Sequence, residues 1–408
     1  MFKLAPAFAL LLLSSVAFAE DWPGWRGPRA DGTATDTGYP ITWSATENVK
    51  WKTLIPGSGH SSPVVSKGKV FVTACIEAEK KRVLYCVDRA SGKILWEQIV
   101  LTSDLERKHG ENSFASSTPA CDGERVFVTF LDKPKMRVFC YDYSGKLLWE
   151  KTPGEFHSVH GFGVAPLLYK DLLVLNGDQD AKAFIVALNK NTGEEVWRTD
   201  RPNKLRSYCP PVAIEVAGKK QLVLTGSICV ASYDPDTGKQ LWIIQGPTEQ
   251  FVSSMVLHDG VLLMTAGHPV CWVMAIDPSG SGDVTKTHVK WSKKNEGGYV
   301  PSPVAHGGKL FVVDDRLGFA SCWDVKTGKE YWKEKLGGAT GYHASAVVAE
   351  GRVYFTNDAG VTFVVKAEGE LDVLAKNAIG EKVYASPAFS DGDIFHRGEK
   401  HLWCIGKK

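Results

Sequence analysis

Short apolar runs, separated by turns rich in Gly and Asp, recur along the whole chain. Residues 70–73 form one such run, which is too short for a helix and is apolar on both faces, as is typical of a strand buried between neighbouring layers. In the turns, Asp accepts backbone N–H bonds and Gly supplies a positive φ. The pattern predicts β-strands joined by tight turns, and the best helical pattern is only one or two turns within residues 103–108.

Two markers make this pattern periodic. A turn motif of Asp or Asn, Gly and an apolar stretch has copies that end at Trp96, Trp149, Trp197, Trp242, Trp291 and Trp332. A small residue, usually beside Pro, opens each unit, at Ser62, Thr118, Ala165, Pro210, Ser254, Ser302, Ser345 and Ser386. The markers lie about 45 residues apart, with room for four short strands in each unit. The sequence therefore predicts an all-β fold, an eight-bladed β-propeller of four-stranded antiparallel blades, with seven blades as the alternative.

The two ends of the chain predict how this ring closes. The last unit runs from Ser386 to Cys404 and stops before any turn with a Trp. Residues 48–53, which include Trp51, look like a fourth strand that has lost its own blade. We expect these N- and C-terminal strands to join in one blade, because closure removes edges that would otherwise pair with other chains.

The first residues have the features of a targeting segment. Lys3 precedes an apolar stretch at residues 4–18 that is too short to span a bilayer, and small residues lead to a cleavage site between Ala19 and Glu20. We divide the chain into a signal peptide (1–19), an N-terminal arm (20–46) and the propeller (47–408). We expect an exported protein, periplasmic or extracellular, that is soluble after cleavage and has no membrane span. Because no Cys lies near the cleavage site, we also expect no lipid anchor.

Charge and cysteine usage narrow the function classes. Lys and Arg number 48 and Asp and Glu 46, so a net charge of +2 gives no electrostatic reason to bind nucleic acid. Nine Cys in an exported protein ordinarily suggest disulfides. Four of them, however, take a repeat position that other units fill with Ala or Ser: Cys86, Cys140, Cys322 and Cys404. We interpret the cysteines as small buried thiols, with the cross-strand bridges Cys75–Cys86 or Cys121–Cys140 as the alternative.

Metal-site motifs are few. His157 and His160 form an H-x-x-H pair in a loop without a clear carboxylate partner, and no C-x-x-C occurs in the sequence. Acidic and Asn residues at 176–178, 314–315 and 357–358 fall at turns, where Asx residues are ordinary turn formers. We expect no metal site and interpret both groups as loop residues.

The mouth of the central funnel is the candidate site. The innermost strand of each blade follows its marker, so residues just before the eight markers converge on one ring. Two positions before these marker residues stand His60, Ser116, Gly163, Tyr208, Val252, Val300, His343 and Tyr384. With their neighbours, they give a predicted ligand-binding set of His60, His157, His160, Arg206, Tyr208, Phe251, Tyr299, Tyr342, His343 and Tyr384. Aromatic and imidazole groups around a concave mouth suit a planar ligand, a sugar or a peptide, and the alternative is that they only plug the channel.

The repeat also resembles a known family. Residues 233–242, with their Asp, Thr-Gly-Lys and Trp, resemble the repeat of pyrroloquinoline-quinone (PQQ)-type β-propellers. Residues 22–28 and 59–64 resemble the exported BamB-like propellers of this group. The resemblance covers almost all of the chain after the signal peptide. Its motifs are specific for the fold, because Trp and Gly serve blade packing and turns.

This resemblance implies two functions. One is a non-catalytic, BamB-like scaffold, a monomer without a cofactor, that binds a protein or glycan partner at its funnel face. The other is a PQQ- and Ca²⁺-dependent quinoprotein oxidoreductase that acts on an alcohol or sugar. Eight blades leave little chain for the insertions that build an enzyme pocket. The sequence also lacks the adjacent Cys pair that caps PQQ in many alcohol dehydrogenases, and any C-x-x-C-H haem site. We therefore favour the scaffold.

Overall fold

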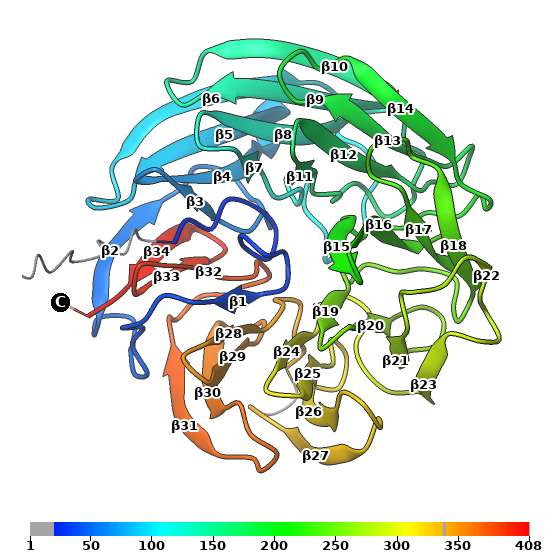
Figure 1. Cartoon of the computed structure of the whole chain (residues 1–408). Coiled ribbons are helices and arrows are strands. Elements are labelled where there is room, and N and C mark those ends of the chain that lie inside the picture. Colours follow the sequence, from blue (N-terminus) through cyan, green and yellow to red (C-terminus); the bar gives the residue numbers. More distant parts are fainter. Residues whose placement is uncertain (1–19, 338–339, 408) are drawn as a thin grey trace, which may run out of the picture.

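Eight β-sheets follow one another around a ring (Figure 1) in a computed structural model that describes residues 20–337 and 340–407. Each sheet contains a blade of four antiparallel strands, and two of the sheets add a short fifth strand in parallel. The prediction of an eight-bladed propeller is confirmed, and the seven-bladed alternative is wrong. The predicted signal peptide, residues 1–19, lies outside the described residues.

The first four blades contain the strands from β3 to β18. Blade 1 consists of β3 (Val64–Ser66), β4 (Lys69–Ile76), β5 (Lys81–Asp88) and β6 (Ile94–Thr102). Blade 2 consists of β7 (Ala120–Cys121), β8 (Arg125–Asp132), β9 (Lys135–Asp142) and β10 (Leu147–Glu155). Blade 3 consists of β11 (Leu167–Tyr169), β12 (Leu172–Gly177), β13 (Phe184–Asn189) and β14 (Glu195–Asp200). Blade 4 consists of β15 (Val212–Val216), β16 (Lys219–Gly226), β17 (Cys229–Tyr233) and β18 (Gln240–Gln245), with β22 (Gly282–Asp283) added parallel to its outer edge.

The other four blades complete the ring. Blade 5 consists of β19 (Val256–His258), β20 (Val261–Ala266), β21 (Trp272–Ile276) and β23 (Val289–Lys294). Blade 6 consists of β24 (Val304–His306), β25 (Lys309–Val313), β26 (Phe319–Asp324) and β27 (Glu330–Lys335). Blade 7 consists of β28 (Val347–Ala349), β29 (Arg352–Thr356), β30 (Val361–Lys366) and β31 (Val373–Ala378), with β1 (Thr33–Ala34) added parallel to β28. Blade 8 consists of β32 (Ala388–Ser390), β33 (Asp393–Arg397), β34 (His401–Ile405) and β2 (Val49–Leu54).

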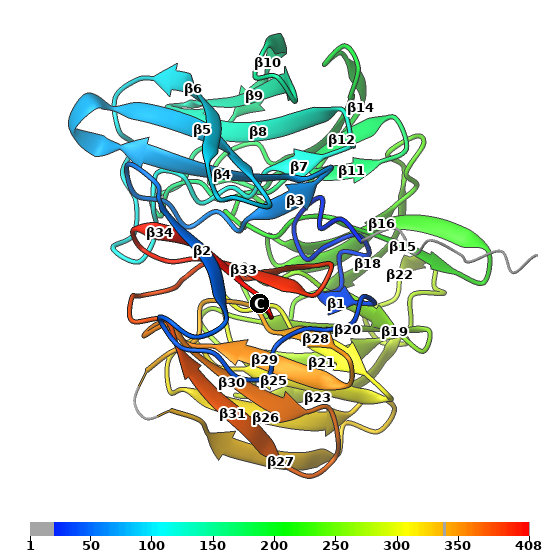
Figure 2. The same ribbon diagram turned by 90° about the vertical axis from the view of Figure 1, so that its left-hand side faces the viewer.

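Blade 8 is built from both ends of the chain. The N-terminal strand β2 pairs antiparallel with the last strand β34, and Trp51 lies opposite Cys404. Figure 2 shows β2 (blue) beside β34 (red). The predicted closure is therefore confirmed, and blade 8 has its outer strand only because the chain returns to its start.

Helices contribute almost nothing to the described part of the chain. The helical element is one 3₁₀ turn, η1 (Glu77–Glu79), between β4 and β5. The helical pattern at residues 103–108 does not form a helix, because this segment runs as an irregular insertion after β6. Within residues 20–337 and 340–407, no helix is long and apolar enough to cross a membrane.

At five junctions of the ring, the repeated Trp joins one blade to the next. The indole lies against the turn Gly of the following blade, and its N–H donates to a carbonyl of that turn. Five junctions share this contact: Trp51–Gly92, Trp96–Gly145, Trp149–Gly193, Trp197–Gly238 and Trp291–Gly328. Among the repeat Trp rings, Trp51, Trp197, Trp242 and Trp332 are buried, whereas Trp96, Trp149 and Trp291 are half-buried.

The strand register explains the cysteines. Cys86, Cys140, Cys322 and Cys404 each lie directly opposite a repeat Trp, where Ala187, Ser232 and Ala275 lie in other blades. All nine Cys are free thiols. The alternative bridge Cys75–Cys86 is wrong, because Cys75 lies opposite Arg82 and Cys86 opposite Phe71. Cys121 and Cys140 are likewise out of register, since Cys121 lies opposite Val126.

Candidate functional site

The centre of the ring contains a cavity of about 690 Å³, within the usual size of a small-ligand site. Its wall includes every residue that stands two positions before a marker residue: His60, Ser116, Gly163, Tyr208, Val252, Val300, His343 and Tyr384. Each blade therefore contributes one of these residues, because the loop that enters the innermost strand ends at the ring axis.

The structure separates the ten predicted site residues into two groups. Six line the cavity: His60, His160, Tyr208, Tyr299, His343 and Tyr384. Four do not: His157, Arg206, Phe251 and Tyr342. Phe251 and Tyr342 are fully buried in the packing between blades, and the Tyr342 hydroxyl donates to the Leu336 carbonyl at 2.8 Å. His157 points to solvent beside Glu155, and Arg206 pairs with Asp180 at 2.9 Å.

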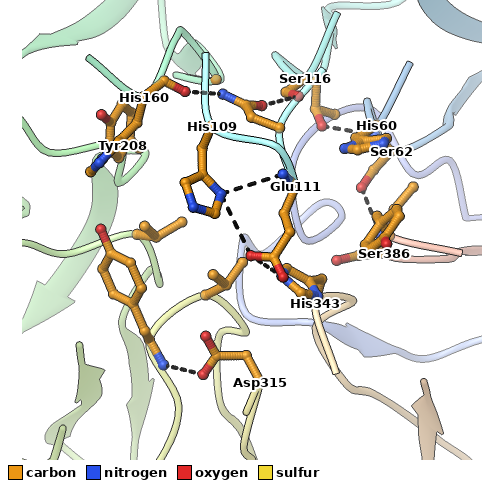
Figure 3. A pocket seen from close by; sticks show the side chains of 18 of the residues that line it. His60, Ser62, His109, Glu111, Ser116, His160, Tyr208, Asp315, His343 and Ser386 are labelled. Atoms are coloured by element: carbon orange, nitrogen blue, oxygen red, sulfur yellow. Dashed lines mark hydrogen bonds and ion pairs between the residues drawn. The ribbon is translucent and has the colours of Figure 1, made fainter. Parts of the chain in front are cut away.

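An imidazole–carboxylate pair lies in the wall of the cavity. Nδ1 of His343 lies 2.8 Å from Oδ2 of Asp358, and the His343 backbone N–H donates to the other carboxylate oxygen at 2.9 Å. Burial lowers the pKa of His343, but the hydrogen bond and charge of Asp358 outweigh burial, so this pKa is raised. The pair thus fixes the ring orientation. On the other side of His343, Nε2 lies 3.7 Å from the Glu111 carboxylate (Figure 3).

His60 has the opposite electrostatic environment. Its ring lies 4.7 Å from the ring of Tyr384, which in turn meets the His343 ring edge-on at 5.0 Å, measured between centroids. Burial, with the nearby His343 and Lys108, lowers the pKa of His60 to about 4. His60 is therefore a neutral imidazole at pH 7, able to donate one hydrogen bond and accept another.

Sequence reasoning missed an insertion that reaches over the mouth. Residues 103–116 contribute four lining side chains, of which Ser116 was predicted and His109, Glu111 and Asn112 were not. The base of the insertion is fixed by an ion pair of 2.5 Å between Arg82 and Glu106, both buried. Its tip is fixed where the Asn112 amide donates to the His160 carbonyl at 2.8 Å. The available signal was the spacing from Ser62 to Thr118, the longest between two markers.

Two turn carboxylates also belong to the cavity, although the sequence analysis treated them as turn formers. Asp314 does form its turn and accepts the N–H groups of Arg316 and Leu317 at 2.6 Å. The next residue, Asp315, lines the cavity, accepts the Tyr299 N–H at 2.8 Å and has its pKa raised by burial. Asp358 lies at the equivalent turn of blade 7. In each of these two turns, the first Asx residue (Asp314 or Asn357) holds the turn and the second (Asp315 or Asp358) lines the cavity.

Below the mouth, marker hydroxyls join successive blades in a ring of hydrogen bonds. At five junctions, the backbone N–H of one marker donates to the hydroxyl of the next: Ser254 to Ser302, Ser302 to Ser345, Ser345 to Ser386, Ser386 to Ser62, and Ser62 to Thr118. The distances run from 2.9 to 3.1 Å. These short side chains leave the cavity open down to its floor.

The N-terminal arm supplies the floor. Trp22 pairs with Val65 of blade 1, and the half-buried Trp25 lines the cavity and donates its indole N–H to Ser254 of blade 5 at 3.3 Å. Arg26 is buried and donates to the carbonyls of Pro303 and Ala346 in blades 6 and 7. The arm therefore spans the ring from blade 1 to blade 7 and lies across the end of the cavity opposite the mouth.

We tested whether the cavity residues fit Ca²⁺, which requires six to eight oxygen ligands. Both carboxylate oxygens of Asp358 are engaged by His343, Asp315 binds a backbone N–H, and Glu111 lies between two imidazoles. In the part of the chain that the structure describes, no cluster of three or more His, Cys, Asp or Glu is arranged to hold a metal ion. The donor set does not fit Ca²⁺.

Comparison with known proteins identifies the family. Residues 79–334 match the family model described as outer membrane protein assembly factor BamB. The chain belongs to this family. Among curated proteins, this BamB-family chain is 25% identical over 236 residues to a quinoprotein ethanol dehydrogenase of Pseudomonas aeruginosa, a match that covers 52% of this chain and 34% of the dehydrogenase. It thus spans about a third of that relative's length.

Solved structures of both kinds share the fold. BamB from Moraxella catarrhalis matches with a TM-score of 0.61 and 10% identity, over 87% of this chain and 98% of that one. A europium-containing methanol dehydrogenase matches with a TM-score of 0.66 and 13% identity, over 94% and 90%. A quinohemoprotein alcohol dehydrogenase from Comamonas testosteroni matches with a TM-score of 0.65 and 13% identity, over 95% of this chain and 81% of that one. At these identities the likeness concerns the fold alone.

Proposed function

We propose that this BamB-family protein is an exported, non-catalytic binding propeller, a monomer, that takes a small ligand or the end of a protein or glycan chain into its funnel. The observation that carries this proposal is the single cavity to which all eight blades contribute a residue and whose far end is covered by Trp25. A cavity with one open end suits an occupant that enters through the mouth and stays.

A plug of packed side chains would leave no such volume. The wall residues His60, Tyr384 and His343 contact one another in turn along the wall: the His60 ring lies tilted against Tyr384 at 4.7 Å, and Tyr384 meets His343 edge-on at 5.0 Å. Membership of a family described as an assembly factor favours a binding role for this surface.

The second candidate is a quinoprotein oxidoreductase. Similarity to the ethanol dehydrogenase and an indole at the floor of a funnel favour it, since an aromatic face can stack on a planar quinone. The chemistry of the carboxylates opposes it, because their hydrogen bonds to His343 and Tyr299 leave no set of oxygens that fits Ca²⁺. We therefore derive no catalytic step through the quinone.

One variant pair tests the binding proposal. Tyr384→Ala with His343→Gln should abolish binding of saccharide or tripeptide probes in calorimetric titrations and leave the melting temperature within a few degrees of the wild type, because Tyr384 is half-buried and lies outside the hydrophobic core. Loss of stability without any binding by the wild-type protein would mean that the ring only plugs the channel. Addition of PQQ with Ca²⁺ and a dye-linked alcohol or sugar assay tests the second candidate, and turnover there would overturn the non-catalytic assignment.

A further inference from the structure

The polar groups of the funnel are suited to hydroxyl groups rather than to ions. Three carboxylates line the cavity, Glu111, Asp315 and Asp358, and Arg316 also lines it. Nε2 of His343 lies 3.7 Å from the Glu111 carboxylate, so charges within the wall are already partly paired. Asp358 is already paired with His343. A strongly charged ligand would therefore have to displace existing pairs, whereas an uncharged ligand would not.

Donors and acceptors alternate around this wall. The neutral imidazole of His60 offers one of each, and Nε2 of His343 faces the Glu111 carboxylate across 3.7 Å, a gap wider than a direct hydrogen bond. The Tyr299 hydroxyl donates to Gln250 at 3.3 Å, a long contact that leaves the hydroxyl oxygen able to accept. A hydroxyl group also donates and accepts, so it can satisfy such mixed neighbours in a way that an anion or a cation cannot.

Aromatic faces complete this environment. Trp25 lies at the floor, and Tyr384 and Tyr299 belong to the wall. Room for Tyr299 comes from Gly267, because a Cβ at that position would lie 1.7 Å from the Tyr299 ring. Aromatic rings pack against the C–H faces of a sugar ring, while polar groups at the rim bind its hydroxyls.

We propose that the funnel recognises an uncharged, hydroxylated ring, the terminal sugar residue of a glycan, with Trp25 beneath the ring and the His343–Asp358 pair on its hydroxyls. This inference rests on the proposed binding function and names its ligand class. Asp358 acts as a positioning residue: its bond to Nδ1 holds the His343 ring so that Nε2 lies toward Glu111, another residue of the cavity wall.

The test is a titration of the full mature chain by calorimetry and saturation-transfer NMR. The neutral probes are methyl glucoside, N-acetylglucosamine and maltose, and the charged counterparts are glucuronate and glucosamine. We expect at least one neutral probe to bind, with the charged counterparts tenfold weaker or more. Asp358→Asn and Trp25→Phe should each weaken binding of that probe tenfold, because Asn cannot accept two bonds from His343 and Phe is the smaller stacking surface.

The matched control is His401→Gln. His401 and Glu381 form another imidazole–carboxylate pair, at 3.2 Å, in blade 8 and away from the cavity wall. This variant should bind the neutral probe as the wild type does. Binding of tripeptides but of no sugar, or preference for a charged sugar, would overturn the inference and leave the binding propeller intact. Failure of every sugar and tripeptide probe would overturn both.

Discussion

The indole of Trp51 lies directly on Gly92 of the next blade. A Cβ at Gly92 would come within 2.6 Å of the Trp51 ring, and the Trp51 N–H donates to the Arg89 carbonyl of the same turn at 2.8 Å. The Trp and the Gly of the repeat motif are therefore one interaction shared by two blades. Gly is required both for a φ of +72° and for the space that the indole occupies.

This relationship predicts the effect of two glycine substitutions. Gly92→Ala should cost about 1–3 kcal/mol of unfolding free energy more than Gly68→Ala, because the methyl group overpacks the indole. Gly68 is the matched control: its φ is +74°, and nothing lies within 4 Å of an added Cβ. Both variants carry the left-handed strain of about 1–2 kcal/mol. Urea unfolding measures the difference, and equal costs would contradict the contact.

The free cysteines predict a thiol count. Titration with a thiol reagent in denaturant, without reductant, should give nine thiols per chain. In the native protein only Cys271, the one half-buried Cys, should react quickly. Burial raises the pKa of the Cys86 and Cys140 thiols to about 12, which suppresses the reactive thiolate. A count below nine in denaturant would reveal a disulfide and would contradict the assignment of nine free thiols.

His396 predicts a loss of stability in acid. Its ring is buried, neither nitrogen has a hydrogen-bond partner in the described structure, and burial lowers its pKa to about 4. The unfolded imidazole takes up a proton below its ordinary pKa of about 6.5, whereas the native one stays neutral until about 4, so stability falls as pH falls through this window. Between pH 7 and pH 4, the unfolding free energy of the His396→Phe variant should fall by about 3 kcal/mol less than that of the wild type. Parallel urea curves for the two proteins across this range would refute the assignment.

The arm predicts a contrast between two arginines. Arg26→Ala removes the donors to the carbonyls of Pro303 and Ala346 and should lower stability by about 1–3 kcal/mol. Arg29→Ala, three residues away, removes only exposed contacts, an ion pair with Glu20 and hydrogen bonds to Thr33, and should cost less than about 1 kcal/mol. Melting curves compare the two, and deletion of residues 20–30 should lower the melting temperature at least as far as Arg26→Ala.

The sequence predicted the parts of this molecule that repeat. Blade number and the eight residues before the markers follow from the spacing of the repeat, because the same loop ends at the axis in every blade. Closure follows from the missing fourth strand at one end of the chain and the extra strand at the other. The direction of individual side chains could not be predicted from the spacing. Tyr342 is buried, whereas His343 beside it faces the cavity, because neighbouring residues in an extended segment point to opposite sides. Tyr299 is the exception that Gly267 permits. The insertion at residues 103–116 and the floor at Trp25 occur once, so no comparison between units could place them.

The pairing of β2 with β34 sets the order of events in folding. β2 is among the first strands to be synthesised, and its partner is the last, so Trp51 has no neighbour in its own blade until the chain is almost complete. Contacts between such distant segments form slowly, because the whole intervening chain must first be ordered. Seven blades can assemble as they emerge, but the ring and its funnel exist only after the final strand arrives. A truncated chain would therefore carry an unpaired β2 edge, which makes incomplete copies prone to associate through that strand.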